Sequence, residues 1–138
     1  MIISKTPYRI SFFGGGTDYP EWYLKNGGEV ISSTIEKFLY ITCRNLPPFF
    51  SHKHRIVYSK IEDVKKIENI KHSAVREALK IYKKKIKNFN GLEIHYDGDL
   101  PARSGMGSSS TFVVGLINAL NSLYNISVSK KKLSKESI

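Results

Sequence analysis

One stretch decides how this sequence folds: Leu92-Glu93-Ile94-His95-Tyr96-Asp97-Gly98-Asp99-Leu100-Pro101-Ala102-Arg103-Ser104-Gly105-Met106-Gly107-Ser108-Ser109-Ser110-Thr111. Residues 92–97 alternate apolar and polar side chains, which predicts a strand with one buried face. Residues 108–124 have little polar face, which predicts a buried helix. Gly115 within that helix costs about 1 kcal/mol relative to alanine, and close packing would explain its presence.

The loop between this strand and helix has the chemistry of a phosphate site. Gly105 and Gly107 permit a tight turn that exposes backbone N–H groups. A helix N-terminus attracts anions, and Arg103 adds a full positive charge. We expect the three serines to cap the helix, and serine hydroxyls can ligate magnesium carried by a nucleotide. An ordinary capped helix remains the alternative, whereas the Walker and dinucleotide glycine patterns do not match.

A second glycine-rich loop follows a predicted strand at residues 8–13, where Ile10 and Phe12 share a face. Three consecutive glycines let a ligand approach the backbone. Asp18 can accept hydrogen bonds from sugar hydroxyls, or it can cap a short helix at 18–25 in which Trp22 and Tyr23 pack. The other polar candidates are Arg9, which could reach a phosphate or be a surface charge, and Thr17 and Tyr19.

The remaining pattern predicts a mixed α+β fold in a single domain. Residues 29–35 and 38–44 predict two strands, with Glu36-Lys37 as the turn between them. Residues 55–58 predict a short strand. Residues 73–87 place five apolar side chains on one helical stripe, which predicts an amphipathic helix: Val75, Ala78, Leu79, Tyr82 and Ile86.

Together the two loops resemble the GHMP kinases, the superfamily of galactokinase, homoserine kinase, mevalonate kinase and phosphomevalonate kinase. Pro7-Tyr8-Arg9 through Thr17-Asp18-Tyr19 is similar to the N-terminal motif of that family, and Pro101 through Ser110 is similar to its phosphate loop. Among members, both strings most resemble the D-glycero-D-manno-heptose 7-phosphate kinases of bacterial surface-sugar synthesis. The resemblance implies an N-terminal kinase lobe with a mixed sheet and packed helices, similar to the second domain of a ribosomal protein.

The resemblance also implies a role for each matching residue. It implies ATP and Mg²⁺ as cofactors, Ser109 as a magnesium ligand, Arg9 as the group that stabilises the transferring or substrate phosphate, and in-line transfer to a sugar hydroxyl. The sugar site would comprise Gly14, Gly15, Gly16, Thr17, Asp18 and Tyr19. The nucleotide site would comprise Pro101, Arg103, Ser104, Gly105, Met106, Gly107, Ser108, Ser109 and Ser110.

The chain departs from the family pattern in length. Members are typically more than twice as long, with a magnesium-binding glutamate and a catalytic aspartate some tens of residues beyond the phosphate loop. No carboxylate here can be assigned as the general base. We therefore expect residues 1–138 to be the N-terminal domain, truncated near its end and without a C-terminal domain, and to be at most weakly active.

Composition sets the alternatives. The chain has 22 Lys and Arg against 12 Asp and Glu, a net charge of +10 that suggests anionic partners. A nucleic-acid-binding module or a nucleotide-binding remnant without turnover therefore stays open, although no nucleic-acid motif appears. We expect the lysine runs to be solvated surface. We also expect no membrane partner and, from the single Cys43 and the absence of a signal-peptide pattern, a cytoplasmic location. The oligomeric state stays open.

Overall fold

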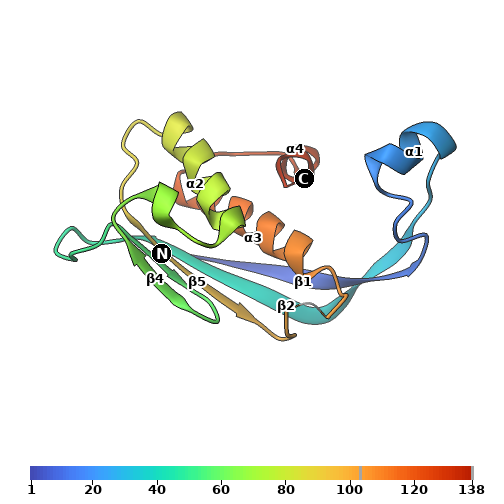
Figure 1. Ribbon diagram of the computed structural model, residues 1–138, viewed down its shortest axis with the longest axis horizontal. Helices are drawn as coiled ribbons and strands as arrows, with labels where there is room; N and C mark the ends of the chain where they lie inside the picture. The colour runs from blue at the N-terminus through green and yellow to red at the C-terminus, as the bar shows by residue number, and fades with distance from the viewer. Residues whose placement is uncertain (103, 138) are drawn as a thin grey trace.

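The computed structural model describes residues 1–102 and 104–137 of the chain. Most of the helices and strands lie where the hydrophobic patterning predicts them. Figure 1 shows how they are arranged. In chain order the elements are β1 (Ile2–Phe13), α1 (Pro20–Asn26), β2 (Ile31–Asn45), β3 (His54–Val57), β4 (Ile61–Val64), the 3₁₀ turn η1 (Ile67–Asn69), α2 (Ser73–Lys85), β5 (Leu92–Gly98), α3 (Ser108–Leu123) and α4 (Lys130–Glu136).

The five strands form one mixed sheet in the order β1-β2-β5-β3-β4. Strands β1, β2 and β5 pair antiparallel, β3 pairs parallel with β5, and β4 closes the far edge as the second strand of a hairpin with β3. This arrangement confirms the predicted α+β class. The sequence analysis did not predict β4, which is only four residues long.

Strand β2 corrects the prediction of two strands with a turn at Glu36-Lys37. It is one continuous strand of 15 residues, which pairs with β1 on one side and with β5 on the other. The pairing jumps from Pro7 opposite Phe38 to Arg9 opposite Thr34, so the polar pair lies in a bulge. A bulge accommodates extra residues without ending the strand.

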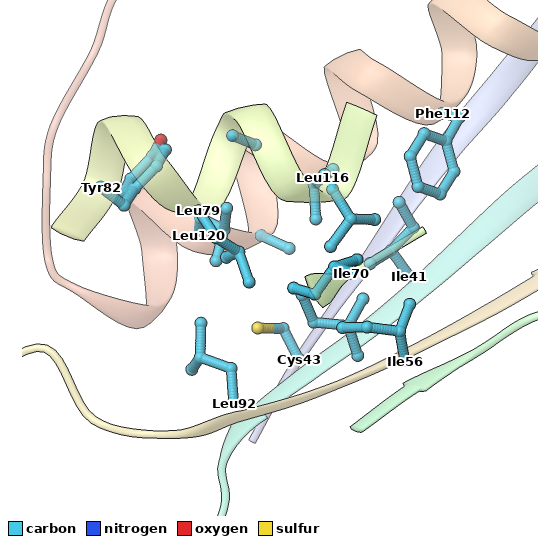
Figure 2. Packing of buried hydrophobic residues seen from close by; sticks show 14 of the residues in the cluster. Ile41, Cys43, Ile56, Ile70, Leu79, Tyr82, Leu92, Phe112, Leu116 and Leu120 are labelled. Carbon is cyan, nitrogen blue, oxygen red and sulfur yellow. The ribbon is translucent and has the colours of Figure 1, made fainter. Parts of the chain in front are cut away.

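Helices α2 and α3 cover one face of the sheet and bury the core between themselves and the strands (Figures 1 and 2). The predicted stripe of α2 is buried from Val75 to Tyr82, and Leu116 and Leu120 of α3 have no exposed surface. A Cβ on Gly115 would lie 2.9 Å from Thr6 Oγ1 and 3.2 Å from Ser4 Oγ. The glycine therefore lets α3 approach β1 closely, and it explains the helix-weakening residue.

The β1–β2 ribbon continues past the N-terminal end of α3 and carries α1 at its tip (Figure 1). Because no element covers this arm, Phe12, Trp22 and Tyr23 are exposed, and the predicted packing of the last two is wrong. Asp18 does not cap α1 either, because the helix begins after Tyr19 and has no side-chain cap. Among the described residues, no helix has the length and apolar content to cross a membrane.

Candidate functional site

The loop between β5 and α3 is fixed to the sheet at its first residues. Asp99 Oδ2 accepts a hydrogen bond from Phe38 N at 2.7 Å, and Asp99 N donates to Phe38 O at 2.9 Å. The hydroxyl of Tyr8 donates to Leu100 O at 3.3 Å. Burial, assisted by nearby Tyr96 and Asp99, raises the pKa of Tyr8 to about 12, so the hydroxyl keeps its proton. The loop thus starts from a rigid base on β1 and β2.

The end of this loop leaves the first turn of α3 without a side-chain cap. Gly107 is the N-cap residue, with φ of +70°, and Gly105 has φ of +75°. The predicted serine cap is wrong, because the hydroxyl of Ser110 donates back to Gly107 O at 2.9 Å. Since the first amides of a helix have no partner within it, they remain available, with the positive end of the helix dipole, for an anion.

Arg9 on β1 lies against this helix start. A Cβ on Gly107 would lie 3.1 Å from Arg9 Cγ and 3.4 Å from Arg9 Nε, so the arginine stem occupies the space that a side chain would need. The backbone of Arg9 also donates to Met106 O at 3.4 Å. Arg9 Nη1 donates to Ser11 Oγ at 2.5 Å, which orients the guanidinium along the strand. A positive charge therefore lies beside the uncapped amides.

A pocket of about 280 Å³ lies on the other side of the α3 N-terminus. Its lining includes Ser108 and Ser109 and an aromatic group from three elements, His72, Tyr96 and Phe112. The His72 ring stacks on Phe112 with centroids 4.8 Å apart, and Tyr96 meets Phe112 edge-on at 5.4 Å. Burial lowers the pKa of His72, which favours the neutral ring. The sequence analysis missed His72, because a single histidine before a helix has no distinguishing pattern.

The buried Glu62 of β4 holds His72 in place. Its carboxylate accepts from Lys71 N at 2.6 Å, His72 N at 3.1 Å and Tyr58 Oη at 2.9 Å. Burial acts to raise the pKa of Glu62, but these hydrogen bonds outweigh it and the pKa is lowered. An ionised carboxylate from the edge strand therefore fixes the start of α2 and one wall of the pocket.

The glycine loop after β1 is organised by its own backbone. Thr17 Oγ1 donates to Gly14 O at 2.8 Å and to Glu29 O at 3.1 Å, and Gly16 N donates to Asp18 Oδ1 at 3.0 Å. A Cβ on Gly14 would lie 1.8 Å from Glu29 O, so only glycine fits there. The Asp18 side chain is exposed at the surface of the loop.

The structure brings some of the predicted site residues together and separates others. Arg9 and the loop Ser104–Ser110 share one site. The predicted sugar residues 14–19 begin five positions after Arg9, at the tip of the arm, and no hydrogen bond among the described residues links them to the phosphate loop. Pro101 is exposed before the turn. The predicted phosphate contact Arg103 lies outside the described residues.

The sequence contains weak indications for some of the residues that position the loop and Arg9. Tyr8 lies two positions before Ile10 on the predicted strand, so both side chains point to the same face. This spacing indicates that the Tyr8 side chain points toward the core. Asp99 directly follows a predicted strand, a position from which a polar side chain can form hydrogen bonds with the neighbouring backbone. Ser11 gave no signal, because only the pairing geometry shows that it contacts Arg9.

The protein offers few metal ligands near the loop. Within residues 1–102 and 104–137, no group of three or more His, Cys, Asp or Glu side chains is arranged to hold a metal ion. Ser104 Oγ is buried without a hydrogen-bond partner among the described residues, and the Ser109 side chain is exposed at the helix start. Such a hydroxyl set fits Mg²⁺ that arrives with phosphate oxygens and water, and does not form a cage of its own.

Comparison with known proteins identifies one family. The family described as GHMP kinases N terminal domain matches residues 73–138. The D-glycero-alpha-D-manno-heptose 7-phosphate kinase of Campylobacter jejuni is 31% identical over 97% of this chain, which covers 41% of that protein. A galactokinase of Pyrococcus furiosus is 27% identical over 95% of the chain, which covers 36% of it.

Solved structures share the fold. A D-glycero-D-manno-heptose 1-phosphate kinase from Bacteroides thetaiotaomicron superposes with a TM-score of 0.81 at 21% identity, over 99% of this chain and 46% of that one. A Streptococcus pneumoniae phosphomevalonate kinase in complex with phosphomevalonate and AMPPNP gives a TM-score of 0.72 at 24% identity, over 99% of this chain and 41% of that one. The chain thus spans less than half of the length of these relatives.

Proposed function

Since the chain belongs to the GHMP kinases, we propose that residues 1–138 form the N-terminal ATP- and substrate-binding domain of a kinase that phosphorylates a sugar or sugar phosphate. Heptose 7-phosphate is the substrate we favour, because the relative that is 31% identical is named for it. One observation carries the proposal: the Arg9 side chain lies against Gly107, where α3 begins without a cap.

The phosphate chain of ATP would bind at this helix start. The amides of Gly105 to Ser108 donate hydrogen bonds to phosphate oxygens, with the dipole of the 16-residue α3 behind them. Arg9 supplies a guanidinium on the opposite side, where charge builds up on the transferring phosphoryl group. Arg103, which lies outside the described residues, would add a second positive charge. The residues of this chain therefore contribute positioning and electrostatic stabilisation, which dominate catalysis of phosphoryl transfer.

Magnesium fits the hydroxyls of the loop. Ser109 would ligate the ion, and Ser104, whose hydroxyl is buried without a partner among the described residues, would contact the phosphates or the metal's water. Bound Mg²⁺ neutralises the charge that develops on the phosphate oxygens. Because the chain supplies no carboxylate cluster within the described residues, we expect Mg²⁺ to bind with ATP and not alone.

The aromatic pocket beside Ser108 and Ser109 would receive the base of the nucleotide. Its volume of about 280 Å³ is smaller than a complete ATP, so the ring would enter while the phosphates extend along the helix start. The flat faces of His72 and Tyr96 suit a planar ring. The exposed loop 14–19 would hold the sugar, with Asp18 as acceptor for hydroxyl groups and Tyr19 as a further contact.

Calorimetry on the 138-residue chain tests the nucleotide site. We expect ATP with Mg²⁺ to bind, Mg²⁺ alone not to bind, and Ser109→Ala to weaken binding roughly tenfold, about the 1.4 kcal/mol of one lost contact to a charged group. Ser122→Ala is the matched control, because Ser122 is exposed near the other end of α3. Equal losses in both variants, or no ATP binding, would refute the site.

Phosphoryl transfer is tested separately. ADP release is measured on a version of the protein extended to the length of its kinase relatives, with heptose 7-phosphate, galactose, mevalonate and homoserine as acceptors. We expect the heptose phosphate to give the largest rate above ATP hydrolysis in water. ATP binding with no transfer to any acceptor would leave a nucleotide-binding remnant as the better description. RNA binding that persists in Arg9→Ala and Ser109→Ala would favour the nucleic-acid module.

A further inference from the structure

A second and larger cavity lies far from the phosphate loop. Its volume is about 920 Å³, and it lies between the connection from β2 to β3, the segment after β4, the end of α2 and the turn before β5. No described residue of α3 or of the loop before it lines this cavity. The ends of α2 and β2, which lie beside its lining residues, are at the opposite end of the molecule from the start of α3 (Figure 1). A helix of 16 residues spans about 24 Å. The cavity therefore is not part of the proposed kinase site.

Positive charge converges on this cavity from separate parts of the chain. Its lining contains four lysines and one glutamate: Lys53, Lys65, Lys66, Lys83 and Glu68. None of these lysines forms a salt bridge within the described residues. A hydrogen bond from its own backbone N–H, with smaller effects of Lys83 and Lys66, lowers the pKa of Glu68, so it stays ionised but leaves a net surplus of positive charge. A solvated lysine run on one helix face does not give this three-sided convergence.

The floor of the cavity is aromatic and rigid. Phe50 and Phe89 are half-buried in the lining, and Phe89 packs against His54 with ring centroids 6.2 Å apart. His54 is buried between the exposed Lys53 and the half-buried Arg55. Its Nδ1 accepts from Leu92 N at 3.3 Å, and burial lowers its pKa to about 4, so it is neutral near pH 7.

The backbone holds the walls at a fixed separation. Leu46 N donates to Gly91 O at 2.7 Å, and Lys53 N donates to Val64 O at 3.0 Å. A Cβ on Gly91 would lie 2.1 Å from Lys53 O, so this glycine lets the two wall segments touch. The lysines therefore project from a preformed frame, which reduces the entropy cost of binding.

We propose that this basic cleft, lined by Lys53, Lys65, Lys66 and Lys83 over Phe50 and Phe89, binds a phosphorylated small molecule with a planar or apolar group. The lysines attract the phosphate, and the aromatic floor accepts the ring or apolar part. The cavity volume falls within the range of small-molecule sites. It is a second ligand site, separate from the proposed kinase site.

An NMR titration of the full 138-residue chain tests the cleft residue by residue. The probes are inorganic phosphate and phenyl phosphate, which carry similar charge at pH 7.5 and differ by the ring. We expect phenyl phosphate to shift the backbone amides of Lys53, Lys66 and Gly91, with an affinity at least five times that of inorganic phosphate. Signals from the phosphate loop report separately on the kinase site.

Variants of equal charge show whether position matters. Lys53→Gln/Lys66→Gln should weaken phenyl phosphate binding at the cleft at least tenfold. Lys25→Gln/Lys37→Gln removes two exposed lysines from α1 and β2 and should change it less than twofold. The spectra themselves show that each variant is folded.

Three results would overturn the proposal. The first is the absence of shifts at the cleft at millimolar phenyl phosphate. The second is equal affinity for the two probes, which would remove the role of the aromatic floor. The third is binding of a single-stranded RNA to these amides that is weakened equally by both double variants, which would make the region part of a general basic surface.

Discussion

The contact between Arg9 and Gly107 gives a prediction that can be worked out in numbers. Gly107 and Gly105 both have left-handed backbone angles, with φ of +70° and +75°. A Cβ at position 107 would lie 3.1 Å from Arg9 Cγ, whereas a Cβ at position 105 meets no atom within 4 Å. Gly107→Ala and Gly105→Ala therefore share the backbone cost and differ in the contacts with Arg9 and, at 3.3 Å, with Ser110 Oγ.

The shared cost is the left-handed conformation, about 1–2 kcal/mol for a residue with a Cβ. Gly107→Ala adds the cost of moving the Arg9 stem by a few tenths of an ångström, at the low end of the roughly 1–3 kcal/mol range for overpacking. We therefore expect Gly107→Ala to lower the free energy of unfolding by about 2–3 kcal/mol and Gly105→Ala by about 1–2 kcal/mol. Urea denaturation followed by circular dichroism measures both values.

A double-mutant cycle isolates the arginine term. In an Arg9→Ala background, the extra cost of Gly107→Ala over Gly105→Ala should fall by the arginine term, a coupling energy of about 1 kcal/mol, and only the contact with Ser110 Oγ should remain. If Gly107→Ala lowers the free energy of unfolding by the same amount with and without the arginine side chain, the close contact does not contribute to stability. If Gly105→Ala costs nothing, the assumption about the left-handed backbone is wrong.

Three other predictions concern the two loops and the basic cleft. Gly14→Ala must displace the glycine loop, because its Cβ would lie 1.8 Å from a carbonyl oxygen, while Gly15→Ala meets no atom within 4 Å; amide shifts across residues 14–19 should be large in the first variant and small in the second. Because burial lowers the pKa of His54 to about 4, the unfolded chain binds a proton below pH 6.5 that the folded chain does not; His54 should therefore lower the free energy of unfolding by about 2 kcal/mol from pH 7 to pH 5, and His54→Asn should lose this contribution in urea titrations but keep that of His72, whose pKa burial also lowers. Asp99→Ala leaves Phe38 N without its acceptor and should cost about 1–2 kcal/mol in the same assay, whereas Asp99→Asn keeps an acceptor oxygen and should cost less.

The sequence predicted the parts of the fold that depend on local pattern. The stripe of α2, the alternation of β5 and the apolar content of α3 each follow from burial of one face, and each is confirmed. Local pattern failed at Glu36-Lys37, because a polar pair inside a strand has the same appearance whether it turns or bulges. Only the pairing with β1, which continues on both sides of Glu36-Lys37, distinguishes the two.

For the candidate site, the sequence predicted which loops carry polar groups but not their spatial relation. Arg9 and the residues from Gly14 to Asp18 belong to one sequence motif. Because β1 continues for four residues beyond Arg9, the glycine loop lies away from Arg9 in the structure. The wall formed by His72 comes from a different part of the chain, 29 residues before Pro101 at the start of the phosphate loop, and its support from Glu62 comes from the edge strand β4. Such long-range contacts have no local signature in the sequence.

The exposed arm of β1 and β2 has a consequence for hydrogen exchange. A two-stranded ribbon without a covering layer is marginally stable, so amides beyond Arg9 should exchange through frequent local opening. In residues 4–8, under α3, the amides that bond to β2 should exchange only when the domain unfolds. Arg9 lies at the boundary between these two regimes on a single strand. A ligand bound to the glycine loop at the tip would then slow exchange up to Arg9, and β1 would transmit occupancy of the proposed sugar site to the proposed phosphate site.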